Sequence, residues 1–141
     1  MSHLLTNIGE EWSLTHNLDG ASVTILLYDD STDSIGEADD LDAITTEPTD
    51  GNYSRQSATL TFAVKSDDGA AVSDAQVSFD VADTTGNVDS YAIIVNFQSS
   101  TAGDESAQDH LVGAGALSQS YDLSNLDTLN VSAETIGHKL N

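Results

Sequence analysis

The chain contains no cysteine, which excludes several kinds of chemistry. Without thiols a protein has no disulfide framework, no thiolate nucleophile and no metal bound through sulfur. Long hydrophobic runs are missing too. No stretch reaches the roughly 18 apolar residues of a membrane span, and the N-terminus lacks the basic and apolar regions of a secretory signal. We therefore expect a soluble protein with no membrane insertion, not exported by a signal of its own.

The chain also contains very few positively charged residues. Arg55, Lys65 and Lys139 stand against 24 acidic residues, so the formal net charge is −21. Such a surface repels phosphate backbones and anionic lipids, which argues against nucleic-acid and membrane partners. Self-repulsion would weaken the fold at ordinary ionic strength, whereas at molar salt the Debye length falls to about 3 Å. Many acids with almost no lysine resemble the proteins of salt-in halophiles, which predicts a high-salt, haloarchaeal environment.

Apolar and polar residues alternate in 57–64 and 75–81, which predicts half-buried antiparallel strands. Residues 23–28 are a nearly continuous apolar run, which suits a buried strand, and 91–97 is the most apolar run of the chain. A length of 141 residues suits a single domain over 1–141. About seven to eight short strands with a short N-terminal helix predict a mainly β fold, an antiparallel β-sandwich or a jelly-roll-like barrel. We expect 91–97 to be the central strand, 65–74 to be a loop, and the glycines of 111–118 to mark a bulge or close backbone approach. The predicted strands are 23–28, 57–64, 75–81, 91–97, 111–118, 126–134 and 135–140.

The N-terminal segment, residues 1–20, has a different spacing. Four large apolar side chains recur at near-helical intervals, which predicts a short helix within 3–18. We interpret these side chains as a docking or oligomer contact. An equally weighted alternative is a helix that closes one end of the sandwich. The four residues are Leu4, Leu5, Ile8 and Trp12.

Residues 29–52 form a long acidic stretch, and loops of this length are usually functional or mobile. Its carboxylates are the hard oxygen ligands that Ca²⁺ or Mg²⁺ prefers. However, the spacing lacks the register of a calcium loop, and acidic clusters are common by chance in so acidic a chain. We therefore favour a solvated surface that attracts Na⁺, K⁺, Mg²⁺ or Ca²⁺ loosely, with no dedicated metal or cofactor. The candidate cation cluster is Asp29, Asp30, Asp33, Asp39 and Asp40.

The sequence carries no catalytic signature. It has no nucleophile elbow, phosphate loop or dinucleotide fingerprint, and DTTG at 83–86 is best interpreted as an ordinary turn. Two N-x-[ST] sequons, at Asn52 and Asn130, are frequent by chance in a chain rich in Ser and Thr. We expect no enzymatic activity, and we expect the scattered histidines at surface or edge positions. These are His3, His16, His110 and His138.

The stretch TEPTDGNYSRQS, residues 46–57, holds the only proline and the only arginine. Proline favours an extended conformation at the residue before it, and Asp-Gly then turns the chain. The tyrosine and the arginine lie on one side of the incoming strand. There the guanidinium can stack on the phenol ring and bind the carboxylate of Glu47 or Asp50. We predict a structural corner, with an intersubunit contact second and ligand recognition third. The corner residues are Pro48, Tyr53 and Arg55.

The whole layout resembles a family of small virion proteins of tailed viruses, described as minor tail or tail-fibre-like proteins. The most recognisable piece is TEP-x-x-G-x-Y-x-R, matched by residues 46–55. An LTN segment at 5–7 leads into IGEEW, followed by DAQVSFDVADTTG (74–86) and LVGAGAL (111–117). One departure is that Thr85-Gly86 stands where the family has Trp-Gly.

This resemblance implies a β-sandwich component of a virion. With the salt signature, it implies a structural protein of a tailed virus of halophilic archaea, assembled in the host cytoplasm. It would decorate the capsid, form a vertex turret or sit on the tail, with major capsid or tail proteins and further copies of itself as partners. One alternative is a fibre or baseplate module that contacts host surface glycans, although aromatic residues are few. Others are a non-viral haloarchaeal surface domain, less expected without a signal, and a calcium-using hydrolase or lectin.

Overall fold

The computed structural model describes residues 3–65, 68–133 and 135–139. Within them it contains nine strands, two α-helices and two 3₁₀ turns, the latter at Leu41–Ala43 and Leu123–Asn125. No described helix is long and apolar enough to cross a membrane. The helices are α1 (Asn7–Thr15) and α2 (Asp30–Asp33). The strands are β1 (His3–Leu5), β2 (Ser22–Tyr28), β3 (Gln56–Lys65), β4 (Asp68–Ser73), β5 (Val77–Asp80), β6 (Asn87–Phe97), β7 (Gln108–Asp122), β8 (Thr128–Val131) and β9 (Gly137–Lys139).

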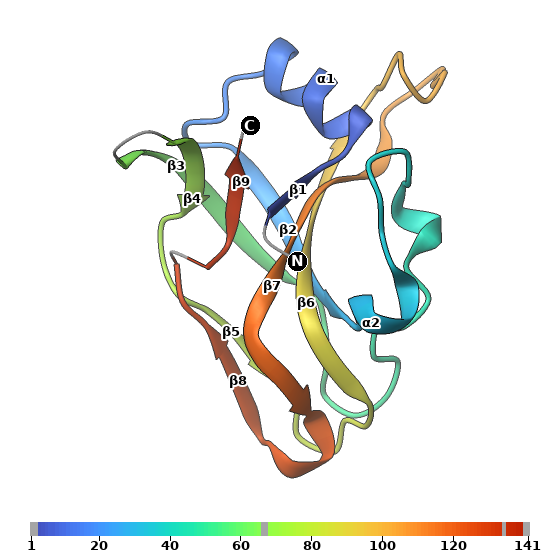
Figure 1. Cartoon of the computed structure of the whole chain (residues 1–141), viewed down its shortest axis with the longest axis vertical. Coiled ribbons are helices and arrows are strands. Elements are labelled where there is room, and N and C mark those ends of the chain that lie inside the picture. The colour runs from blue at the N-terminus through green and yellow to red at the C-terminus, as the bar shows by residue number, and fades with distance from the viewer. Residues whose placement is uncertain (1–2, 66–67, 134, 140–141) are drawn as a thin grey trace.

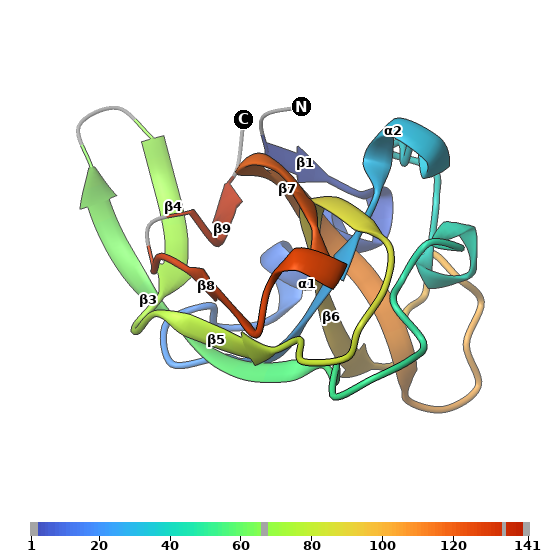
Figure 2. The ribbon, with the colours of Figure 1, turned by 90° about the horizontal axis from the view of Figure 1, so that it is seen from below.

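The strands form two antiparallel sheets, which confirms the predicted mainly β, sandwich-like fold. The large sheet has the order β1-β7-β6-β2-β3-β4-β9, and β5 pairs with β8 in a small second sheet. The large sheet curls strongly, so that the pair β5–β8 lies across its concave side (Figures 1 and 2). Strand β6 is an interior strand, next to the middle strand β2, as its apolar run indicates.

Strands β2 and β6 are buried on both faces, which explains why their sequences are nearly continuous apolar runs. One face of β2, with Ile25 and Leu27, packs toward the small sheet and Phe79 of β5. The other face, with Leu26 and Tyr28, belongs to a second apolar cluster. The curled sheet therefore separates two core layers.

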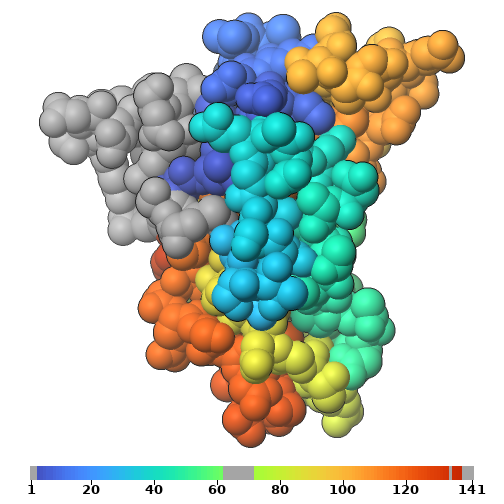
Figure 3. All heavy atoms as spheres, turned by 45° about the vertical axis from the view of Figure 1, so that its right-hand side comes forward, coloured from blue at the N-terminus to red at the C-terminus, as the bar shows by residue number. Residues whose placement is uncertain are grey.

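The acidic segment 29–52 covers the second core layer. Ile35 is buried against it, and Leu41 and Ile44 are partly buried there. In the space-filling view this segment, cyan to green, occupies the middle of the visible face, below the N-terminal part and the loop 98–107 (Figure 3). The segment is therefore a packed cover of the sheet, built around α2 and the 3₁₀ turn at Leu41–Ala43.

The predicted N-terminal helix is present but shorter than expected. Leu4 and Leu5 lie on the edge strand β1, where Leu4 pairs with Ala114 of β7, because pairing with β7 overrides their helical spacing. Thr6 then caps α1: its hydroxyl accepts from the Gly9 N–H (2.9 Å). A side chain at Gly9 would lie 1.9 Å from the Val112 carbonyl oxygen. Helix α1 can therefore approach β7 closely only because this residue is glycine.

The expected loop at 65–74 is wrong. Residues Asp68–Ser73 form strand β4, which pairs with β3 on one side and β9 on the other. Its small residues carry little hydrophobic periodicity, so that only its partners reveal it as a strand. With β1 and β4 added, the described chain has nine strands instead of seven to eight. The expected irregularity in 111–118 is confirmed, because the β6–β7 register shifts between Ile93 and Ile94, opposite Val112.

A buried tyrosine ties the two ends of the curled sheet together. The Tyr91 hydroxyl accepts from the Gly137 N–H at 3.0 Å and lies 2.8 Å from Nδ1 of His3. Burial raises the pKa of Tyr91 above its usual range. A side chain at Gly115 would lie 2.3 Å from the Tyr91 hydroxyl oxygen. The glycine on β7 therefore makes room for the contact between β1 and β9.

Candidate functional site

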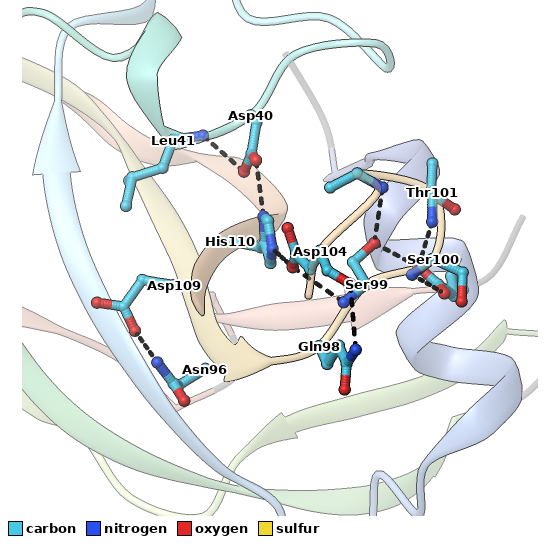
Figure 4. Close-up of polar contacts among 12 residues, drawn as sticks. Asp40, Leu41, Asn96, Gln98, Ser99, Ser100, Thr101, Asp104, Asp109 and His110 are labelled. Atoms are coloured by element: carbon cyan, nitrogen blue, oxygen red, sulfur yellow. Dashed lines mark hydrogen bonds and ion pairs between the residues drawn. The ribbon is translucent and has the colours of Figure 1, made fainter. Parts of the chain in front are cut away.

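A buried histidine between two carboxylates is the most unusual polar feature of the described chain. The His110 side chain is only 4% exposed; its Nδ1 lies 2.7 Å from Asp40 and its Nε2 lies 2.5 Å from Asp104 (Figure 4). The three residues come from β7, segment 29–52 and the loop 98–107. The expected surface or edge position of His110 is wrong, because that segment and that loop fold over the start of β7. Phe97 packs against the imidazole edge, with ring centroids 5.6 Å apart.

The two carboxylates hold the imidazole in its charged form. Burial acts to lower the pKa of His110, but hydrogen bonds to Asp104 and Asp40 and their charges outweigh it, so that the pKa is raised. The Ser99 N–H and the His110 ring lower the pKa of Asp104. The other oxygen of Asp40 accepts from the Leu41 and Leu111 N–H groups, at 2.8 and 2.9 Å. The cluster therefore favours the charged form of the His110 imidazole, with a carboxylate at each ring nitrogen.

A third carboxylate, that of Glu11, links the loop 98–107 to helix α1. Glu11 accepts from the Ser99 hydroxyl (2.5 Å), the Ser100 N–H (2.7 Å) and the Thr101 N–H (3.3 Å). The Ser99 hydrogen bond, helped by those two N–H groups, lowers the pKa of Glu11 to about 2. The Ser99 N–H in turn donates to Asp104 at 3.0 Å. We call this set the acid–imidazole cluster; it comprises Glu11, Asp40, Ser99, Asp104 and His110.

The acid–imidazole cluster contains a serine, a histidine and acids, but their connections differ from those of a hydrolase. A catalytic serine donates to the imidazole, which must have a free nitrogen to accept the proton. Here Ser99 donates to Glu11, and each ring nitrogen of His110 is bound to a carboxylate. This arrangement can hold α1, segment 29–52, the loop 98–107 and β7 together, and it can hold a proton on His110 between Asp40 and Asp104.

The predicted cation cluster in segment 29–52 does not form a common site. Instead each carboxylate accepts from donors close to it: Asp33, for example, accepts from both the N–H and the hydroxyl of Thr45 and of Thr46. Among the described residues, no group of three or more His, Asp or Glu side chains is placed to hold a metal ion. The carboxylates lie at different points along the segment, and each one holds its own part of the segment by hydrogen bonds. The other acceptors there are Asp29, Asp30, Asp39 and Asp40.

The structure brings the residues of the predicted corner together around Glu47. This carboxylate accepts from Nε of Arg55 at 2.9 Å, from its NH2 group at 2.8 Å and from the Tyr53 hydroxyl at 2.9 Å. The Tyr53 oxygen also accepts from the Leu27 N–H at 3.1 Å. Its ring stacks on Phe79, with centroids 6.1 Å apart, instead of on the guanidinium. Burial raises the pKa of Tyr53.

The same corner is fixed to the turn 83–86. Gly51 has φ +62°, and a side chain there would lie 2.3 Å from the Asp83 carbonyl group. Asp50 accepts from the Thr85 N–H at 2.9 Å. Pro48 is half-buried just before this contact. The turn at 50–51 that the sequence predicts is therefore also a packing contact with a distant segment.

The predicted docking residues divide into two pairs. Ile8 and Trp12 lie in the first core layer, with Trp12 only 2% exposed, so that they help α1 to close one end of the sheet. Leu4 and Leu5 are half-buried on the edge strand β1, where a contact with another chain stays a prediction. Sequence reasoning missed Leu14 of α1, which is 84% exposed. Its position on the polar side of α1, away from Ile8 and Trp12, was the available signal.

No protein-family model, curated protein or solved structure matches this chain. The geometry of the acid–imidazole cluster and of the corner, together with the sequence, is therefore the basis for a functional proposal.

Proposed function

We propose that this chain is a non-enzymatic structural protein of the particle of a tailed virus that infects halophilic archaea. It is an exposed module on the capsid, as a decoration or vertex turret, or on the tail. The observation that carries the proposal is the corner at 46–55, which contains the motif by which the sequence resembles small virion proteins. In the fold the motif residues Glu47, Gly51, Tyr53 and Arg55 each make a contact that holds the corner together.

Those contacts explain the residue types of the motif. Glu47 is the common acceptor for Tyr53 and Arg55. Gly51 is the residue that allows the backbone of the turn 83–86 to approach. The corner thus joins the end of segment 29–52, the start of β3 and a turn of the second half of the chain. The proposal is supported in that the residues that carry the resemblance are the ones that build this corner.

The use of acidic residues supports the high-salt setting. Exposed carboxylates such as Asp50 and Asp122 accept from neighbouring backbone and hydroxyl groups. In this role they hold loops in place without basic partners, while their repulsion is screened in concentrated salt. Such a surface suits a particle exposed to brine. The partners we propose are the major capsid or tail proteins and further copies of this chain, with Leu14 a candidate contact.

Mass spectrometry of purified virus particles tests this proposal. We expect peptides of this chain in a fixed ratio to the major capsid protein or to a tail protein, and antibody labelling at the corresponding part of the particle. Particles that infect normally and contain none of this chain would overturn the proposal. Because the corner is structural, Arg55→Ala should reduce incorporation into particles, whereas the incorporated copies should support normal host attachment.

A further inference from the structure

A small hollow lies between the second half of β7 and strand β8, on the side of the molecule away from the acid–imidazole cluster. Its volume is about 180 Å³, and it is open to solvent. In Figure 1 the lower part of β7 runs alongside β8 at this place. Leu117, Ser118 and Tyr121 line it from β7, and Leu129 and Asn130 line it from β8. The size suits a single ring and not an extended chain.

The hydroxyl groups of the hollow occur in pairs that can each donate and accept. The Ser118 and Tyr121 hydroxyls are 2.8 Å apart, and those of Ser132 and Thr135 are 2.7 Å apart; in either pair each oxygen can be the donor. A hydroxyl pair keeps one proton and several lone pairs for a further partner. Such groups match a ligand whose own groups are both donors and acceptors.

The hollow also has an apolar side. Leu129 and Val131 are buried beneath it, and the half-buried Tyr121 adds an aromatic ring that packs on the core. An aromatic body with a polar tip binds ligands that are themselves apolar on one face and polar at the rim. Ligand sites commonly combine such surfaces with a few placed polar groups.

Charge narrows the class of ligand further. None of the described residues that line the hollow is charged, although the chain has 24 acidic residues. A cation would prefer the carboxylates elsewhere on the surface, and a phosphate or sulfate would be repelled by the net charge of −21. We propose that this hollow binds one neutral sugar ring, with the hydroxyl pairs bonding its hydroxyls and Tyr121 packing on its C–H face. This inference rests on the hollow alone and does not depend on a place in a virus particle.

Two sources could supply the sugar. Asn130 of β8 lines the hollow and begins the sequon Asn130-Val131-Ser132, and its side-chain oxygen accepts from the Ser78 hydroxyl of β5 at 2.7 Å. A glycan attached there would have to give up this hydrogen bond to turn toward Tyr121. The other source is a glycan of another molecule. Both present the same chemistry to the hollow.

Titration with methyl glycosides of glucose, galactose, mannose and N-acetylglucosamine tests the proposal. The chain, made without glycosylation and kept in molar KCl, would be observed by saturation-transfer-difference NMR, with glycerol as a non-ring polyol. We expect saturable binding of at least one glycoside and none of glycerol. Tyr121→Ala should weaken binding by about tenfold or more, equivalent to roughly 1.4 kcal/mol. Ser118→Ala should weaken it by about fivefold because one hydroxyl is lost.

Ser120→Ala is the matched control, since Ser120 is an exposed serine on the same strand outside the lining. It should bind as the unchanged chain does. Absence of saturable binding to all four glycosides, or equal binding by the Ser118→Ala and Ser120→Ala variants, would overturn the proposal. If Tyr121→Ala fails to fold, the comparison of Ser118→Ala with Ser120→Ala still decides whether the hollow binds the sugar.

Two further measurements distinguish the two sources of the sugar. A glycan found at Asn130 by mass spectrometry of the natural protein, with a terminal or core sugar that the unmodified chain also binds, indicates occupation in cis. An unmodified Asn130, with binding retained in Asn130→Gln, indicates an external glycan. A particle that contains this chain and yet shows no glycoside binding would leave the structural role intact and refute only the sugar site.

Discussion

Replacing His110 with alanine is the sharpest test of the acid–imidazole cluster. The change removes the cation between Asp40 and Asp104 and leaves two carboxylates facing the same space. Removing one partner of a buried ion pair costs about 3–5 kcal/mol. Asp40 remains 31% exposed, so that solvent screens part of this loss. We therefore expect a loss of about 3 kcal/mol in the free energy of unfolding for His110→Ala.

Urea denaturation in molar KCl, followed by circular dichroism, measures this loss. His16→Ala is a matched control because His16 also packs edge-on against Phe97, with centroids 5.5 Å apart, but is exposed. It should change stability by less than about 0.5 kcal/mol. If the His110→Ala and His16→Ala variants lose stability equally, the buried ion pairs do not stabilise the fold as we argue.

The pH profile gives a second readout of the same cluster. The folded pKa of His110 is raised, so that its stabilisation is complete below about pH 6.5 and is lost as the pH rises through the folded pKa. The folded pKa of Asp104 is lowered, so that its stabilisation is present above about pH 4 and is lost as the pH falls through the folded pKa. The difference between the original chain and His110→Ala should therefore be largest between about pH 4 and 6.5. Glu11, close to Asp104, stays ionised throughout this window. A difference that does not vary with pH would contradict the ionic origin.

Gly9→Ala should destabilise the chain by about 1–3 kcal/mol, because the new methyl group would meet the Val112 carbonyl at 1.9 Å. Gly36→Ala is its control, where the nearest atom is 3.7 Å away; similar urea midpoints for the two variants would refute the tight packing of α1. Arg55→Ala should cost about 1 kcal/mol, since the Arg55 side chain is 37% exposed and its pair with Glu47 is bidentate; an unchanged midpoint would show that the corner does not need it. Finally, the β-signal in circular dichroism should be lost at low salt and regained in molar KCl because of charge screening, and full structure at ~50 mM salt would refute the halophile argument.

Local patterns in the sequence predicted most of the fold but misplaced its edges. Apolar and alternating runs led to β2, β3, β5, β6, β7, β8 and β9. Strands β5 and β8 bury side chains with a period of two, whereas β2 and β6 are buried on both faces. Strand β4 was missed because its Gly and Ala residues give no periodicity, and β1 because its leucines also fit a helix. Strand β1 is defined by its pairing with the distant β7, whereas β4 pairs with the adjacent β3 in a hairpin and with the distant β9.

The corner could be predicted because its parts lie within ten residues of one another. Glu47, Tyr53 and Arg55 meet across a short turn, where Pro48 restricts the backbone and Gly51 supplies the positive φ. The acid–imidazole cluster could not be predicted, since Asp40 and His110 are 70 residues apart. In the structure His110 pairs with the core residue Val95 of β6, a register that the sequence does not give. Alternation alone also does not say which acids would meet the imidazole.

Composition and local spacing determined that this chain is mainly β, has a highly acidic surface, lacks thiol chemistry and turns sharply at 50–51. These properties depend on residue type or on neighbours along the chain. Only the tertiary structure decided that segment 29–52 covers a second core layer, that its acids act as separate hydrogen-bond acceptors and not as one cation site, and that His110 is buried between two of the chain's acids. The physical reason is that burial, and with it the strength of an ion pair or the pKa of a histidine, depends on which distant segments pack together.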